Sequence, residues 1–106
     1  IPWRHVPVVD HRDRHGWQSY VCLLEAAKTR IARNDLMEAL LQRGIHTRAG
    51  THAVHNLRYY RERFALRAQD YPVAFECDAA TIAIPLHNRM CEDDYHYVVR
   101  VLRELS

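Results

Sequence analysis

The histidines of this sequence gather in one short stretch. Residues 44–55 read Gly-Ile-His-Thr-Arg-Ala-Gly-Thr-His-Ala-Val-His and hold three of the eight histidines. Imidazole is a common zinc ligand that changes charge near neutral pH, so His46, His52 and His55 suggest a metal site. No cysteine or carboxylate lies at a supporting spacing, which favours histidines that hydrogen-bond within a folded loop. We therefore predict no metal site, and the metal-bound loop is the weaker alternative.

Residues suited to covalent catalysis are scarce. The chain has no Gly-x-Gly-x-x-Gly fingerprint and no Gly-rich loop ahead of Lys-Ser or Lys-Thr. Its only serines are Ser19 and Ser106, neither in a nucleophile motif, and Cys22 falls within a predicted strand. Lys28 is the only lysine. We expect no catalytic residue in this chain.

Composition indicates one ordinary globular domain. The 106 residues are 48% apolar and 26% charged, with a net charge of +2. No apolar run is long enough to span a membrane, and no secretory signal is recognisable, so we expect no membrane partner. Three widely spaced cysteines predict reduced thiols and a cytoplasmic location. The chain begins without methionine, which suggests a piece of a longer protein.

Arginines lie among aromatic residues between residues 58 and 67, a mixture that also occurs in RNA-binding proteins. Glu62 and Asp70 interrupt this basic run. A solvated helix face is the simpler interpretation, and we predict no nucleic-acid partner.

The chain must place the histidine loop on a small framework. An apolar, β-branched run predicts a strand over 17–24, followed by a connector at 25–32. A helix is predicted over 34–43, with Asn34 as its N-cap and Gly44 as the glycine that ends it. Alternating polarity then predicts a strand over 45–49, and apolar residues at helical spacing predict a helix over about 56–65.

The second half repeats this alternation. A short helix is predicted to begin at about residues 70–72, with Val73, Cys77 and Ala80 facing inward. A strand follows over 81–86, where Pro85 indicates a strand end. The last helix spans about 92–104, with Cys91 as a weak cap. Its predicted buried stripe is Tyr95, Val98, Val99, Leu102 and Leu105.

These elements predict an α+β, two-layer fold, in which helices cover one face of a small mixed or antiparallel sheet of about three strands. Residues 1–16 read as an extended lead-in or linker, and residues 17–106 as the domain. One face of so small a sheet is expected to stay uncovered.

Four motifs occur in a recognisable order. They are Trp-Gln-Ser-Tyr-Val at 17–21, Leu-Leu-Gln-Arg-Gly-Ile at 40–45, Gly-Thr-His-Ala-Val-His at 50–55, and Ile-Pro-Leu-His-Asn-Arg-Met at 84–90. The succession resembles the C-terminal portion of the DegT/DnrJ/StrS-type aminotransferases, which act largely on keto sugars bound to nucleotides. The resemblance covers about residues 3–105.

The resemblance implies a fold and a cofactor. The family has the fold of aspartate aminotransferase, a fold-type I enzyme, with a large domain that carries pyridoxal phosphate on a lysine and a small C-terminal α/β domain. This chain looks like the small domain alone. Lys28 matches no cofactor lysine of the family, so pyridoxal phosphate is expected in the intact enzyme and not on this chain alone.

The resemblance also implies site residues. In many members the loop after the second strand reads His-Tyr, then a few residues, then Pro-Leu-His, and it borders the substrate pocket. His55 matches the final histidine, while Gly50 and Thr51 replace the His-Tyr pair. The resemblance therefore implies a substrate-binding set made of Arg48, Thr51, His52 and His55. The simpler alternative is that the loop histidines only hold the domain together.

Together these features predict the C-terminal domain of a pyridoxal-phosphate-dependent aminotransferase that acts on a keto sugar and is inactive alone. Its partners would be the missing large domain or the full-length subunit, in a homo-oligomer. The alternative is a stand-alone truncated module that self-associates or binds a protein partner without catalysis, since a small domain cut from its partner leaves apolar surface uncovered.

Overall fold

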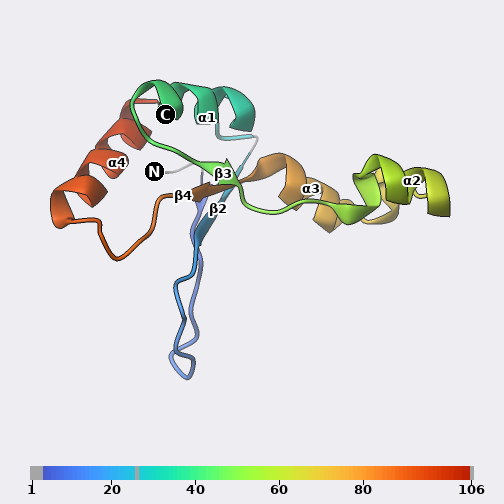
Figure 1. The fold of residues 1–106 in the computed structure, drawn as a ribbon, viewed down its shortest axis with the longest axis horizontal. Coiled ribbons are helices and arrows are strands. Elements are labelled where there is room, and N and C mark those ends of the chain that lie inside the picture. The colour runs from blue at the N-terminus through green and yellow to red at the C-terminus, as the bar shows by residue number, and fades with distance from the viewer. Residues whose placement is uncertain (1–3, 26, 106) are drawn as a thin grey trace.

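The computed structural model describes residues 4–25 and 27–105 (Figure 1). Its strands are β1 (Arg4–His5), β2 (Tyr20–Leu24), β3 (Arg48–Ala49) and β4 (Thr81–Ile84). Its α-helices are α1 (Arg33–Gln42), α2 (Arg58–Phe64), α3 (Pro72–Ala80) and α4 (Glu92–Glu104). Two single-turn 3₁₀ helices, η1 (Val54–Asn56) and η2 (Ala68–Asp70), flank α2. None of the described helices has the length and apolar character needed to cross a membrane.

The sheet is small and antiparallel throughout, and its strands lie in the order β1-β2-β4-β3. The predicted α+β class with a small antiparallel sheet is confirmed. The additional strand is β1, which lies in the lead-in and pairs Arg4 with Leu24. Between β1 and β2 the chain runs away from the sheet and back as a long hairpin (Figure 1).

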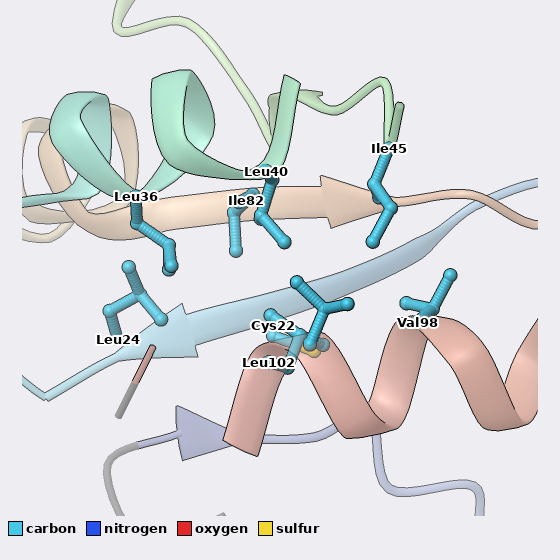
Figure 2. Close-up of a cluster of buried hydrophobic side chains, with 9 residues drawn as sticks. Cys22, Leu24, Leu36, Leu40, Ile45, Ile82, Val98 and Leu102 are labelled. Atoms are coloured by element: carbon cyan, nitrogen blue, oxygen red, sulfur yellow. The ribbon is translucent and has the colours of Figure 1, made fainter. Parts of the chain in front are cut away.

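The core lies between one face of the sheet and two helices. Cys22, Leu24 and Ile82 alternate along β2 and β4 and point to the same side, as the two-residue period of a strand requires. Helices α1 and α4 cover that side, and Figure 2 shows their side chains meeting the strand residues. The helix residues of this cluster, together with Ile45, are Leu36, Leu40, Val98, Val101 and Leu102. Because side chains alternate along a strand, the residues between these core residues point to the opposite face of the sheet.

Helix α1 ends as predicted but begins earlier. Gly44 has φ +74°, its N–H donates to the Leu41 carbonyl (2.9 Å), and the Ile45 N–H donates to the Leu40 carbonyl (2.9 Å). This pair of bonds is a Schellman motif, which also brings Ile45 into the core beside Leu40. The predicted N-cap, Asn34, is wrong: Ala32 is the N-cap, because its carbonyl accepts the first helical bond from Leu36.

Three predicted strands are shorter in the structure. The strand predicted over 17–24 is β2, which begins only at Tyr20, because Trp17 adopts φ +48° and breaks the extended run. In the predicted strand at 45–49 only Arg48 and Ala49 pair with β4, because the helix-ending motif holds Ile45. The predicted strand at 81–86 ends at Ile84, before Pro85, which has no N–H to donate.

Helices α2 and α3 extend to one side of the body (Figure 1), and neither contains a buried residue within the described chain. The prediction that Val73 faces inward is wrong, since 73% of it is exposed. Helix α4 has its predicted bounds, and Val98 and Leu102 are buried as expected, but Tyr95 is exposed. Cys91 is the N-cap of α4, as predicted.

A carboxylate reinforces that cap. The Cys91 N–H donates to the Asp94 carboxylate (2.9 Å), which lies three residues on, as in a capping box. Hydrogen bonds from the Cys91 backbone, then from its side chain, lower the pKa of Asp94 below the ordinary value of 3.8. The charged form of this carboxylate is therefore the one that stabilises the helix start.

We predict that Asp94→Ala lowers the free energy of unfolding more than Asp93→Ala, which also removes a first-turn charge but leaves the bond to Cys91. The folded-state pKa is depressed, so this stabilisation is present above the unfolded value of 3.8 and is lost as pH falls through the lower folded value. Urea unfolding of both variants over acidic and neutral pH measures the difference, which should close at low pH. An equal loss for both variants at every pH would contradict the assignment.

Candidate functional site

The sheet has a second face, which α1 and α4 do not cover. Arg48 pairs with Ala83, and Ala83 pairs with Val21. These residues alternate with Cys22 and Ile82, which point into the core, so Arg48 lies on the opposite face. We call this the open face.

A depression of about 520 Å³ lies beside Arg48, and we call it the open-face pocket. It forms where three segments meet at one end of the sheet: the residues before β2, the residues before β3 and the residues after β4. They meet because β2 and β4 are antiparallel, with Tyr20 opposite Ile84. The pocket is lined by Gln18, Ser19, Gly44, His46, Arg48, Ala83, Ile84, Pro85, Leu86 and His87.

The ionisable residues of the open-face pocket are all basic. Arg48, His46 and His87 line it, and no Asp or Glu does. The His87 Nδ1 accepts a hydrogen bond from the Arg89 N–H (3.2 Å), which orients the ring. Such a set can bind a negatively charged group, with the guanidinium able to donate two parallel hydrogen bonds.

The loop after β3 turns away from this pocket at Gly50. The Gly50 N–H donates to the Thr81 carbonyl (3.2 Å), which continues the pairing of β3 with β4 for one residue. A Cβ at this position would lie 2.6 Å from the Thr81 Oγ1 and also against the Val21 side chain. A glycine is therefore required here by close approach of two strands. Thr51 and His52 follow it on the surface, with the His52 Nδ1 3.7 Å from the Asp78 carboxylate.

His55 lies at the base of the loop. Only 6% of it is exposed, its Nε2 lies 3.3 Å from the Ala68 carbonyl, and its ring centroid lies 5.0 Å from that of Tyr71. A second cavity of about 410 Å³ lies beside it, lined by His52, Ala53, Val54, His55, Leu66, Tyr71 and Ala74. In this chain His55 joins the loop to the segment between α2 and α3.

The four residues predicted as a substrate-binding set therefore divide. Arg48 lines the open-face pocket, whereas His52 and His55 line the second cavity, and the exposed Thr51 lines neither. The three loop histidines divide in the same way, since His46 accompanies Arg48. Among the described residues, no three His, Cys, Asp or Glu side chains are grouped closely enough to hold a metal ion.

Pyridoxal phosphate requires an amine for its Schiff base, and Lys28 is the only lysine of the chain. Its Nζ pairs with the Glu25 carboxylate (2.7 Å) in the segment after β2, and it lines neither cavity. The residues of this chain do not fit a site for the cofactor on their own.

Sequence reasoning had assigned no substrate-binding role to Gln18, His46 or His87, which line the open-face pocket with Arg48. The predicted strands themselves could have indicated these residues. Pairing the predicted strand at 17–24 antiparallel to that at 81–86 brings residues 18–19 beside residues 85–87.

Comparisons with known proteins agree on one family. The profile of the DegT/DnrJ/EryC1/StrS aminotransferase family matches residues 2–103. The spore coat polysaccharide biosynthesis protein SpsC of Bacillus subtilis (strain 168) is 29% identical over 106 residues, which are 99% of this chain and 27% of SpsC.

Solved structures agree on the fold. PseC of Helicobacter pylori, an aminotransferase of pseudoaminic acid biosynthesis, matches 82% of this chain with 23% of its own, at a TM-score of 0.72 and 16% identity. Spr1654 of Streptococcus pneumoniae, a proposed sugar aminotransferase solved in its PMP form, matches the same share of this chain with 21% of its own, at a TM-score of 0.71 and 19% identity.

The fold is thus similar to that of one part of these two proteins. This chain belongs to the DegT/DnrJ/EryC1/StrS aminotransferase family, as its resemblance implied. It spans about a quarter of the length of the relatives that it matches.

We predict that Gly50→Ala lowers the free energy of unfolding by about 1–3 kcal/mol, because the added methyl group must displace Thr81 or Val21. Gly16→Ala is the matched control, since a Cβ there meets nothing within 4 Å and the residue has no positive φ. Urea unfolding monitored by circular dichroism measures both. A Gly50→Ala variant as stable as the Gly16→Ala variant would contradict the close approach.

Proposed function

We propose that this chain is the small C-terminal domain of a pyridoxal-phosphate-dependent aminotransferase that acts on a keto sugar linked to a nucleotide. The observation that carries the proposal is the family match over residues 2–103, in a chain that corresponds to only 27% of SpsC. The biosynthetic roles named for SpsC and PseC, spore coat polysaccharide and pseudoaminic acid, support a sugar substrate.

The proposal divides the work between two parts of the enzyme. Bound cofactor supplies the electron sink for amino transfer, and the large domain would carry the lysine that holds it. This chain would line the substrate pocket through Arg48, Thr51, His52 and His55. Arg48 would bind from the open face, Thr51 and His52 from the exposed loop, and His55 from the loop base that it also stabilises. We further propose a cytoplasmic location, in keeping with three cysteines that form no disulfide among the described residues.

Amino transfer by the full polypeptide tests this proposal. The full polypeptide, purified from its source with pyridoxal phosphate, should transfer the amino group of an amino acid to a nucleotide-linked keto sugar, and the 106-residue chain alone should not. Arg48→Gln in the full polypeptide should lower kcat/KM by roughly tenfold or more, since a charged hydrogen bond is lost. Arg103→Gln is the control, because Arg103 is exposed on α4, which covers the other face of the sheet.

Two results would overturn the proposal. One is amino transfer by the 106-residue chain alone, and the other is a full polypeptide that neither binds pyridoxal phosphate nor transfers an amino group. Equal kcat/KM for the Arg48→Gln and Arg103→Gln variants would remove Arg48 from the substrate pocket and leave the assignment to the enzyme intact.

A second candidate function rests on the exposed side chains of α2 and α3. We define the aromatic arm as residues 54–75, in which Tyr60 stacks on Phe64 (6.3 Å) and meets Tyr59 edge-on (5.2 Å). Its exposed large apolar residues are Val54, Leu57, Tyr59, Tyr60, Phe64, Tyr71, Val73 and Phe75. Apolar surface on this scale favours association, either with the rest of the enzyme or, for the isolated chain, with a second copy.

We predict that the isolated chain forms a homodimer or higher oligomer whose population rises with concentration. Phe64→Ser, in the aromatic arm, should shift the equilibrium toward monomer, whereas Val8→Ser should not, since Val8 is 93% exposed on the distant hairpin. Sedimentation velocity over a range of concentrations measures the equilibrium. A monomer at every concentration would rule out this second function.

A further inference from the structure

We propose that the open-face pocket is a binding site for an oxyanion, the phosphoryl or carboxylate group of a small molecule. The identity of the ligand rests on the proposed function. The affinity for an anion rests only on the residues that line the pocket. The pocket is a depression of about 520 Å³, a size suited to a group of a small ligand.

Arg48 carries the proposal because its charge is not used within the fold. Several arginines pair with nearby carboxylates, including Arg12 with Asp10 and Arg58 with Glu62. Among the described residues the Arg48 side chain makes no hydrogen bond and no ion pair, although its backbone belongs to the strand that pairs with β4. A guanidinium held by its backbone and free at its tip is suited to bidentate binding of phosphate or carboxylate.

The other polar side chains of the pocket supplement this charge. The His46 side chain makes no hydrogen bond or ion pair within the described chain. The His87 ring accepts the Arg89 N–H at Nδ1 and also interacts electrostatically with Asp94. Gln18 and Ser19 add an amide and a hydroxyl at the start of β2. Each of these groups can donate a hydrogen bond to an oxygen of the ligand.

Two carboxylates line depressions that share a histidine with the open-face pocket, and each accepts a hydrogen bond from another group. Asp94 lies near His87, but its carboxylate accepts the Cys91 N–H (2.9 Å) at the start of α4. Glu38 shares a neighbouring depression with His46, and its carboxylate accepts from the Gln42 side chain (3.3 Å). Neither lines the open-face pocket, so no carboxylate of the pocket lining offsets the charge of the Arg48 guanidinium.

The apolar wall of the pocket strengthens binding. Ala83, Ile84, Pro85 and Leu86 come from the end of β4 and border the basic residues on one side. Charge interactions are stronger beside apolar surface than in open water, because the local dielectric constant is lower. The chemistry fits two sources equally: the diphosphate of a nucleotide-linked sugar, or the carboxylate of the amino donor.

Titration of the 106-residue chain tests the inference. Inorganic phosphate, uridine diphosphate and glutamate are added separately at one pH and ionic strength, and binding is followed by ¹H–¹⁵N NMR. We expect shifts confined to residues 18–19, 44–48 and 83–87. Arg48→Gln should weaken binding by roughly tenfold or more, while Arg103→Gln on the opposite face should change it by less than about twofold.

The probes distinguish the two sources. Tighter binding of uridine diphosphate assigns the pocket to the nucleotide diphosphate, and tighter binding of glutamate assigns it to the amino donor; both support an oxyanion site. Absence of binding by all three probes, or equal weakening by Arg48→Gln and Arg103→Gln, overturns it. Either of those results leaves the amino-transfer assay of the full polypeptide unaffected, so the two proposals fail separately.

Discussion

The pairing of β2 with β4 is the constraint on which the rest of this structure depends. It places Cys22 opposite Ile82, and these two residues with Leu24 form the apolar face that α1 and α4 bury. Because side chains alternate across a strand, burial of that face sends Arg48 and Ala83 to the other side. The same pairing brings the segments around Gln18 and His87 to one end of the sheet, where the open-face pocket forms.

Two surfaces of the described chain lie outside the packing of α1 and α4 on the sheet. One is the open face with its basic pocket, and the other is the aromatic arm, whose helices α2 and α3 bury no residue within the described chain. Both are expected of a domain that works against a larger body, since the chain corresponds to about a quarter of its relatives. The membership of the aminotransferase family points the same way.

Local sequence signals predicted the framework well and the long-range contacts poorly. Gly44 and the stripe of α1 predicted a helix end that the structure shows as a Schellman motif. Val73 was wrongly placed inside because helical spacing shows which residues share a face, not whether anything covers that face. The strand β1 was missed because two residues carry no periodicity, and the pocket residues were missed because only strand register brings them together. The proposed substrate set followed from a resemblance between loop sequences. Such a resemblance does not show that Arg48, before Gly50, lines one cavity while His52 and His55, after it, line another.

The central claim is that this chain is one part of a cofactor-dependent enzyme, and the mass of the native polypeptide tests it most directly. An antibody raised against these 106 residues would detect the native polypeptide and give its mass. Mass spectrometry of the captured polypeptide would identify the peptides upstream of this chain. We expect a polypeptide about three to four times longer than this chain, in keeping with its 27% share of SpsC, with a cofactor-bearing lysine upstream. A native polypeptide no longer than these 106 residues would contradict this proposal, because its only lysine, Lys28, pairs with Glu25 and lines neither described cavity.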